Sequence, residues 1–157
     1  MHDILQYIVN TQRSRHYTSF YLMNPKQFLM IGGIVLLVVG IAGFVVILGP
    51  TASQSIFGPS WYFDNGENWA HTILGAVALI VAFALPAGMQ AGVTLLVGVV
   101  GLIVGLWGFL LPSTPPNFYG ANLENPLDNI LHLAVGLWAI ISWRGAKKMM
   151  SSPGMKM

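Results

Sequence analysis

Two short segments of the chain share one pattern of polar residues that could do chemistry. Residues 67–75 and 128–136 both read acid-Asn-x-x-His-x-x-x-Gly, 61 positions apart. The pattern places Glu67, Asn68, His71 and Gly75 in the first segment and Asp128, Asn129, His132 and Gly136 in the second. Carboxylates and imidazoles bind protons and metal ions. Any chemistry of this chain is therefore expected at these positions.

The pattern leaves four interpretations open. Asparagine is a preferred helix cap, so Asn68 and Asn129 are expected to begin two helices, and this interpretation needs no cofactor. Alternatively, His71 and His132 ligate haem b or a chlorophyll-like pigment. A divalent metal such as zinc or iron would accept the ligand set Glu67, His71, Asp128 and His132. Finally, each acid precedes its histidine by four residues, so the pairs can face each other on a helix and respond to pH.

The sequence also excludes several function classes. It has no cysteine, which rules out disulfides, thiolate metal sites and iron–sulfur clusters. The G-x-S-x-G, phosphate-loop and H-E-x-x-H motifs are absent, and no basic run suggests nucleic acid. We therefore predict no recognisable catalytic machinery and favour a structural or accessory membrane protein over an enzyme.

The composition identifies the elements that must position these residues. Of 157 residues, 55% are apolar and 8% are charged, whereas a soluble domain carries about 25% charge. A membrane-spanning helix needs about 20 apolar residues. Four runs approach or reach that length, at residues 28–48, 69–85, 91–111 and 127–143. The predicted fold is all-α, a polytopic bundle of four transmembrane helices in contact with the lipid bilayer.

The basic residues predict the orientation of these spans. All seven lie near the two ends of the chain, namely Arg13, Arg15, Lys26, Arg144, Lys147, Lys148 and Lys156. Positive charge stays on the cytoplasmic side, so both termini are expected in the cytoplasm of an inner-membrane protein. The predicted domains are a cytoplasmic segment 1–23, interfacial or disordered, a transmembrane domain 24–145 and a basic tail 146–157.

The repeated motif also predicts an internal duplication of the chain. The offset of 61 also relates Gly40 to Gly101, which predicts two parallel helix–loop–helix repeats. Small residues let membrane helices approach closely. The positions expected to pack helices are Gly40, Gly75, Gly101, Gly105 and Gly136. They serve either packing within one bundle or the contact face of a homo-oligomer or larger membrane complex.

The second motif carries a resemblance to a known family. Residues 129–136, Asn-Ile-Leu-His-Leu-Ala-Val-Gly, resemble an Asn-x-x-His-Leu-x-x-Gly-like signature of an uncharacterised family of small bacterial membrane proteins. Residues 68–75 are a looser copy, with Thr72 in place of leucine. The resemblance covers about residues 24–145. It implies four spans, an inner-membrane location and no known activity.

Overall fold

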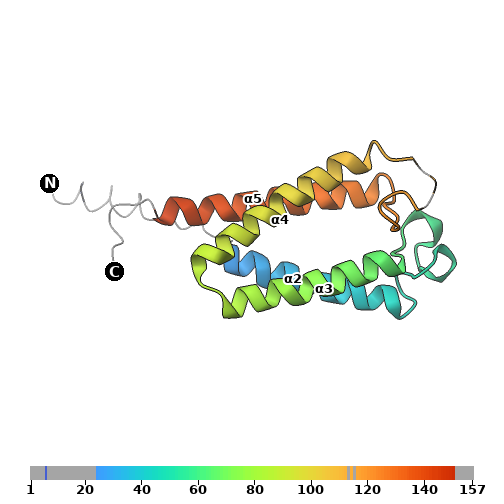
Figure 1. The fold of residues 1–157 in the computed structure, drawn as a ribbon, viewed down its shortest axis with the longest axis horizontal. Helices are drawn as coiled ribbons and strands as arrows, with labels where there is room; N and C mark the ends of the chain where they lie inside the picture. Colours follow the sequence, from blue (N-terminus) through green and yellow to red (C-terminus); the bar gives the residue numbers. More distant parts are fainter. Residues whose placement is uncertain (1–5, 7–23, 113, 115, 151–157) are drawn as a thin grey trace.

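The structure is a computed structural model that describes residues 6, 24–112, 114 and 116–150 (Figure 1). Its elements are α2 (Pro25–Phe44), the 3-10 turns η1 (Ala52–Gln54) and η2 (Gly58–Ser60), α3 (Asn65–Ala84), α4 (Ala87–Gly108) and α5 (Leu127–Met150). The predicted all-α class is confirmed for this part of the chain. Nearly all of the predicted segment 1–23 and residues 151–157 of the tail lie outside the described residues.

The helices differ from the predicted spans mainly at their ends. α2 begins at Pro25 because Asn24 and Gln27 form a reciprocal capping box, with hydrogen bonds of 2.9 and 3.0 Å. Such polar caps precede the apolar run, so hydropathy alone places the start of a helix too late. α5 runs to Met150, beyond the predicted end at residue 143. Basic residues that follow an apolar run continue a helix readily, although they end a hydropathy window.

Three of the four long helices are long and apolar enough to cross a membrane. These are α2, α3 and α4. The predicted membrane character is therefore confirmed for three helices, by their length and composition. α5 is not among them, because its first turns carry Asp128, Asn129 and His132 and it reaches Arg144 near its end.

The helices form two antiparallel pairs, seen side by side in Figure 1. We call α2 with α3 the first hairpin and α4 with α5 the second. In both, glycines bring the two backbones together. A Cβ built on Gly75 would lie 2.8 Å from the backbone oxygen of Gly33, and one on Gly136 would lie 3.0 Å from that of Gly98. Such spacing leaves no room for a larger residue.

The glycine contacts correct one predicted equivalence. A Cβ on Gly40 and a Cβ on Gly105 would each lie 2.8 Å from a motif asparagine's backbone oxygen, that of Asn68 and Asn129 respectively. Gly40 therefore corresponds in its contacts to Gly105, at an offset of 65 (105 − 40), rather than to Gly101. The chain from glycine to asparagine spans 28 positions in the first hairpin (68 − 40) and 24 in the second (129 − 105). One fixed offset consequently cannot align both helices of each pair.

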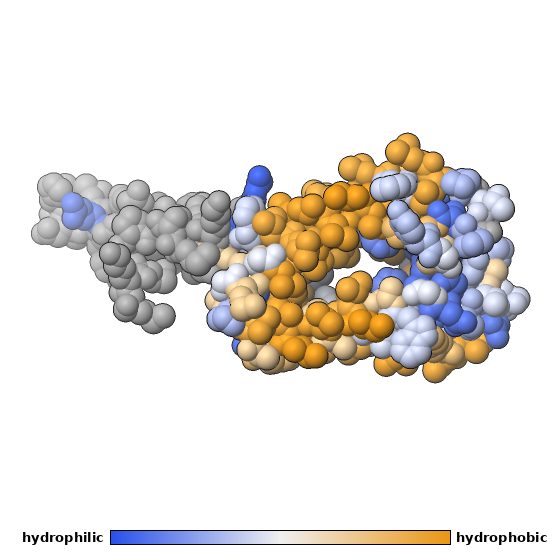
Figure 2. Space-filling model, viewed as in Figure 1, coloured by the Kyte–Doolittle hydropathy of each residue, from blue (hydrophilic) through white to orange (hydrophobic). Residues whose placement is uncertain are grey.

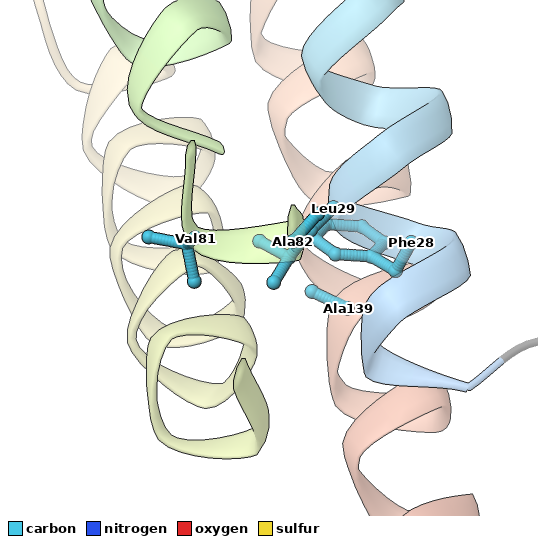
Figure 3. Packing of buried hydrophobic residues seen from close by; sticks show 5 residues of the cluster. All are labelled: Phe28, Leu29, Val81, Ala82 and Ala139. Atoms are coloured by element: carbon cyan, nitrogen blue, oxygen red, sulfur yellow. The ribbon is translucent and has the colours of Figure 1, made fainter. Parts of the chain in front are cut away.

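The two hairpins meet in a small apolar core at the end near the α3–α4 turn. Figure 3 shows its buried members, which come from three helices and are Phe28, Leu29, Val81, Ala82 and Ala139. The ring of Phe28 also packs edge-on against Trp138, at a centroid distance of 4.7 Å. The adjoining turn is held by the buried Gln90, whose Nε2 donates to the carbonyls of Ala82 and Leu85 at 3.0 and 2.8 Å.

Large apolar side chains cover the outside of the helices. Each long helix carries such a residue that is 53–65% exposed, namely Ile34, Ile80, Leu96 and Ile141. Figure 2 shows apolar residues along both hairpins and hydrophilic residues gathered at the loop end. This surface is compatible with a lipid environment.

Candidate functional site in the polar cap

The polar residues gather at the loop end of the molecule, where α3 and α5 begin (Figures 1 and 2). We call this group the polar cap. Its members, from both hairpins, are Trp61, Asp64, Glu67, Asn122, Glu124 and Asp128. Sequence analysis selected Glu67 and Asp128 from this group.

The first part of the polar cap is built by the start of α3. Asp64 caps the helix, because its Oδ1 accepts a hydrogen bond from the Glu67 N–H at 3.0 Å. In return, Glu67 Oε2 accepts one from the Asp64 N–H at 3.0 Å. The second carboxylate oxygen of Asp64 accepts from the backbone N–H of Asn122 at 2.7 Å. The helix start is thereby tied to the loop of the other hairpin.

The predicted capping role of the two motif asparagines is wrong. Asn68 lies inside α3, which is already capped by Asp64, and Asn129 is the third residue of α5. Both side chains are fully buried. A Cβ on Gly43 would lie 1.7 Å from Asn68 Oδ1, and one on Gly108 would lie 1.7 Å from Asn129 Oδ1. Each asparagine therefore packs its amide against a glycine of the neighbouring helix.

Asp128 is the acceptor at the centre of the polar cap. Its Oδ1 accepts from the indole Nε1–H of Trp61 at 2.7 Å, and its Oδ2 accepts from the Glu124 N–H at 2.7 Å. Trp61 belongs to the loop of the first hairpin, so this contact crosses between the hairpins. Both oxygens of this buried carboxyl group therefore have a hydrogen-bond donor.

The histidines do not pair with the acid side chains in the predicted way. His132 Nδ1 lies 2.7 Å from the backbone oxygen of Asp128, which can only accept, so Nδ1 donates this hydrogen bond. The Asp128 carboxylate is occupied elsewhere, and the expected Asp128–His132 side-chain pair is wrong. The His71 ring packs edge-on against Phe63, at 5.1 Å between centroids. Haem or pigment ligation by His71 and His132 stays a prediction.

Three carboxylates converge in the polar cap. Glu67, Glu124 and Asp128 each offer an oxygen, and these oxygens all lie within 4.8 Å of one another. Among the described residues this group contains neither histidine. Of the predicted ligand set, this group therefore includes Glu67 and Asp128 but neither His71 nor His132. Glu124 takes part because its position four residues before Asp128 puts it at the entrance of α5.

The electrostatics of the polar cap reflect this crowding of acids. Burial and the neighbouring Asp128 raise the pKa of the Glu124 carboxyl from 4.5 to about 9. The pKa of the Tyr62 hydroxyl is also raised, first by burial and then by the charges of Glu124 and Asp64. Both shifts follow from negative charge gathered in a place where water is scarce.

Sequence reasoning missed four members of the polar cap, and only some of them carried a signal. Asp64 and Glu67 match the capping-box spacing, which could have moved the start of the helix. The bond between Trp61 and Asp128 joins residues 67 positions apart in the chain. No local pattern predicts such a contact.

The contact from Trp61 gives a direct test of the polar cap. We expect Trp61→Phe to lower the free energy of unfolding in mild detergent by about 1–3 kcal/mol, because the buried Asp128 carboxyl group loses a hydrogen-bond donor. The Trp61 ring lies 5.3 and 5.2 Å, between centroids, from the rings of Phe57 and Phe63, and a phenylalanine ring at this position keeps both contacts. The matched control is Trp69→Phe on the 59%-exposed Trp69, expected within about 0.5 kcal/mol of wild type. Equal effects of the two changes would contradict this role of Trp61.

Comparisons of the chain with protein-family models, with curated proteins and with solved structures gave no match. The resemblance of residues 129–136 to an uncharacterised membrane family stays a prediction.

Proposed function

We propose that this chain is a structural or accessory protein of the cytoplasmic membrane, with four spans and both termini in the cytoplasm. Its distinguishing part is the polar cap, which joins the two hairpins on the outer side. The observation that carries the proposal is the pair of cross-hairpin hydrogen bonds in the cap, Trp61 to Asp128 and Asn122 to Asp64, both 2.7 Å long.

The fourth span is supported by the position of α5. It packs against α4 through Gly98, Gly105 and Gly136, and its middle carries the exposed apolar side chains of Leu137 and Ile141. Its polar first turn belongs to the cap, and its basic last turns match the cytoplasmic side. A helix of 24 residues is about 36 Å long, which exceeds the hydrocarbon thickness of about 30 Å.

Two parallel repeats are supported by matching contacts in the two hairpins. Gly75 and Gly136 take equivalent places against Leu37 and Leu102, since a Cβ on either glycine would lie 2.8 Å from the leucine's backbone nitrogen. The histidine and the asparagine occupy the same helical positions relative to these glycines in both motifs. A duplication of one helix–loop–helix unit accounts for this correspondence.

Reporter fusions test the topology. We expect a fusion at Gln90 to report the cytoplasm and a fusion at Thr114 to report the outer side, because these positions follow two and three crossings. Periplasmic activity at Gln90 would overturn the four-span arrangement. The accessory role is tested on blue-native gels in mild detergent, where we expect a species larger than the single chain; a strictly monomeric protein counts against it.

A proton-responsive cap is the second candidate function, and the raised pKa of Glu124 favours it. Glu124 lies in the same cap as the hydrogen bonds that join the two hairpins, so a change in its protonation would act on that junction. The expected pH dependence is developed in the Discussion.

A further inference from the structure

The three carboxylates of the polar cap are arranged like ligands around a common centre. Glu67 comes from the first turn of α3, Glu124 from the loop before α5 and Asp128 from the first turn of α5. They are 5%, 8% and 2% exposed, and their offered oxygens lie within 4.8 Å of one another. Two oxygens on opposite sides of a Ca²⁺ ion are about 4.6–5.2 Å apart, because each Ca–O bond is about 2.3–2.6 Å long.

Two of these carboxylates keep a buried oxygen without a partner. Glu67 uses Oε2 for the capping box, and its Oε1 accepts no hydrogen bond. Glu124 uses Oε1 for the side-chain amide of Asn122, and its Oε2 accepts none. A buried carboxylate oxygen in this state needs a proton or a cation, because burial without either costs several kcal/mol.

The basic side chains that the structure describes cannot supply that cation. Lys26 begins α2 at the opposite end of the first hairpin, where its Nζ lies 5.8 Å from the centre of the Phe83 ring. Arg144 follows Asp128 by 16 positions on α5, a distance of about 24 Å along the helix axis. Neither charge reaches the polar cap, so no lysine or arginine side chain that the structure describes neutralises its acids.

We propose that Glu67, Glu124 and Asp128 form a binding site for one divalent metal ion that prefers oxygen ligands, of the class of Ca²⁺ or Mn²⁺. An all-carboxylate ligand set selects such hard cations over Zn²⁺ or Cu²⁺, which prefer nitrogen and sulfur. Glu67 belongs to the first hairpin, and Glu124 and Asp128 belong to the second. The ion therefore bridges the hairpins at the place where Trp61 and Asn122 already connect them. Ion binding depends on the geometry of the cap and not on which side of the membrane the cap lies. A chain that binds no ion therefore leaves the four-span topology untouched, and that topology is tested separately by the reporter fusions.

The experiment uses the full chain in detergent or nanodiscs after chelation and dialysis. Mn²⁺ is titrated and its free concentration is read by electron paramagnetic resonance, while Ca²⁺ competes for the same site. We expect one Mn²⁺ per chain, bound below 1 mM, a range that is typical of extracellular calcium modules, about 10⁻⁴–10⁻³ M. At an ion concentration 100 times the Kd, Tm should rise by roughly 5–10 °C.

Two glutamine variants and one matched control locate the ion. Glu67→Gln and Glu124→Gln remove one charged ligand each, and we expect each to weaken Mn²⁺ binding at least tenfold. Gln at position 67 retains the capping box. The control is Asp3→Asn, which replaces an acidic side chain that is not a member of the polar cap. Its Kd should therefore stay within about threefold of wild type.

The outcomes decide the proposal in either direction. No Mn²⁺ binding to the wild-type chain below 1 mM would overturn it and leave a proton-neutralised cluster. Binding that survives both glutamine changes would overturn it as well, because the ion would lie elsewhere. If a glutamine variant does not fold, Glu124→Asp takes its place. It keeps the charge but shortens the ligand, and several-fold weaker Mn²⁺ binding is expected, whereas unchanged binding contradicts the assignment.

Discussion

Replacing Gly75 or Gly136 by alanine is expected to lower the free energy of unfolding by about 1–3 kcal/mol for each change, through overpacking. A Cβ on Gly75 would lie 2.8 Å from Gly33 O and from Leu37 N, and one on Gly136 would lie 2.8 Å from Leu102 N. These are backbone atoms of the partner helix, so no side chain can move aside. The helices of the hairpin must separate along their contact. Unfolding in mild detergent, followed by circular dichroism, measures the loss.

Two other glycines provide matched controls on the same hairpins. A Cβ on Gly32 in α2 or on Gly92 in α4 would meet nothing within 4 Å. Alanine at these positions removes only a glycine from a helix interior, so we expect an unchanged or slightly higher stability, by up to about 1 kcal/mol. If alanine at Gly75 and Gly136 behaves like alanine at Gly32 and Gly92, close packing of the hairpins is not what these motif glycines provide.

The second large effect is a loss of stability of the metal-free protein as the pH rises. The pKa of Glu124 is about 9 in the folded chain and 4.5 ordinarily, so between these values the folded state holds a proton that the unfolded state has lost. Stability therefore falls as the pH rises from about 4.5 to 9. The upper limit is about 1.4 kcal/mol per pH unit for one group. We expect Tm in the presence of a chelator to be higher at pH 5 than at pH 8.

The groups around Glu124 define the control for this prediction. It interacts electrostatically with Asp128 from α5, with Glu67 from α3 and with the Tyr62 hydroxyl in the loop of the first hairpin. Glutamine at position 124 cannot titrate, so Glu124→Gln should reduce the difference in Tm between pH 5 and pH 8. A wild-type protein that is more stable at pH 8 than at pH 5 without metal would contradict the account.

Hydropathy predicted the helices of this protein because each long helix contains an apolar run along most of its length. The runs that contain Gly40 and Gly101 overlap most of α2 and α4, but each helix starts before its run and ends before the run does, at Phe44 and Gly108. Those shifts arose at capped starts such as Asn24 and Asp64, where polar side chains satisfy free N–H groups outside the apolar run. Composition cannot register a cap, but the three-residue spacing of a capping box can.

The motif predicted where the polar cap lies better than it predicted what each residue does. Glu67 and Asp128 meet because the motifs begin helices at the same end of the molecule. The motif asparagines became packing residues, because Asp64 already caps α3 and Gly43 leaves space for the Asn68 amide. Glu124 was not selected, since its approach to Glu67 depends on the tertiary fold of two loops.

The central claim, a four-span protein with its polar cap on the outer side, is tested most directly by cysteine labelling. The chain has no cysteine of its own, so single replacements report one position each. Tyr119, in the loop before α5, is 90% exposed, and Met89, at the start of α4, is 54% exposed. We predict that a membrane-impermeant maleimide labels Tyr119→Cys in intact cells and labels Met89→Cys only after the cells are permeabilised. Labelling of Met89→Cys in intact cells, with Tyr119→Cys protected, would contradict the account.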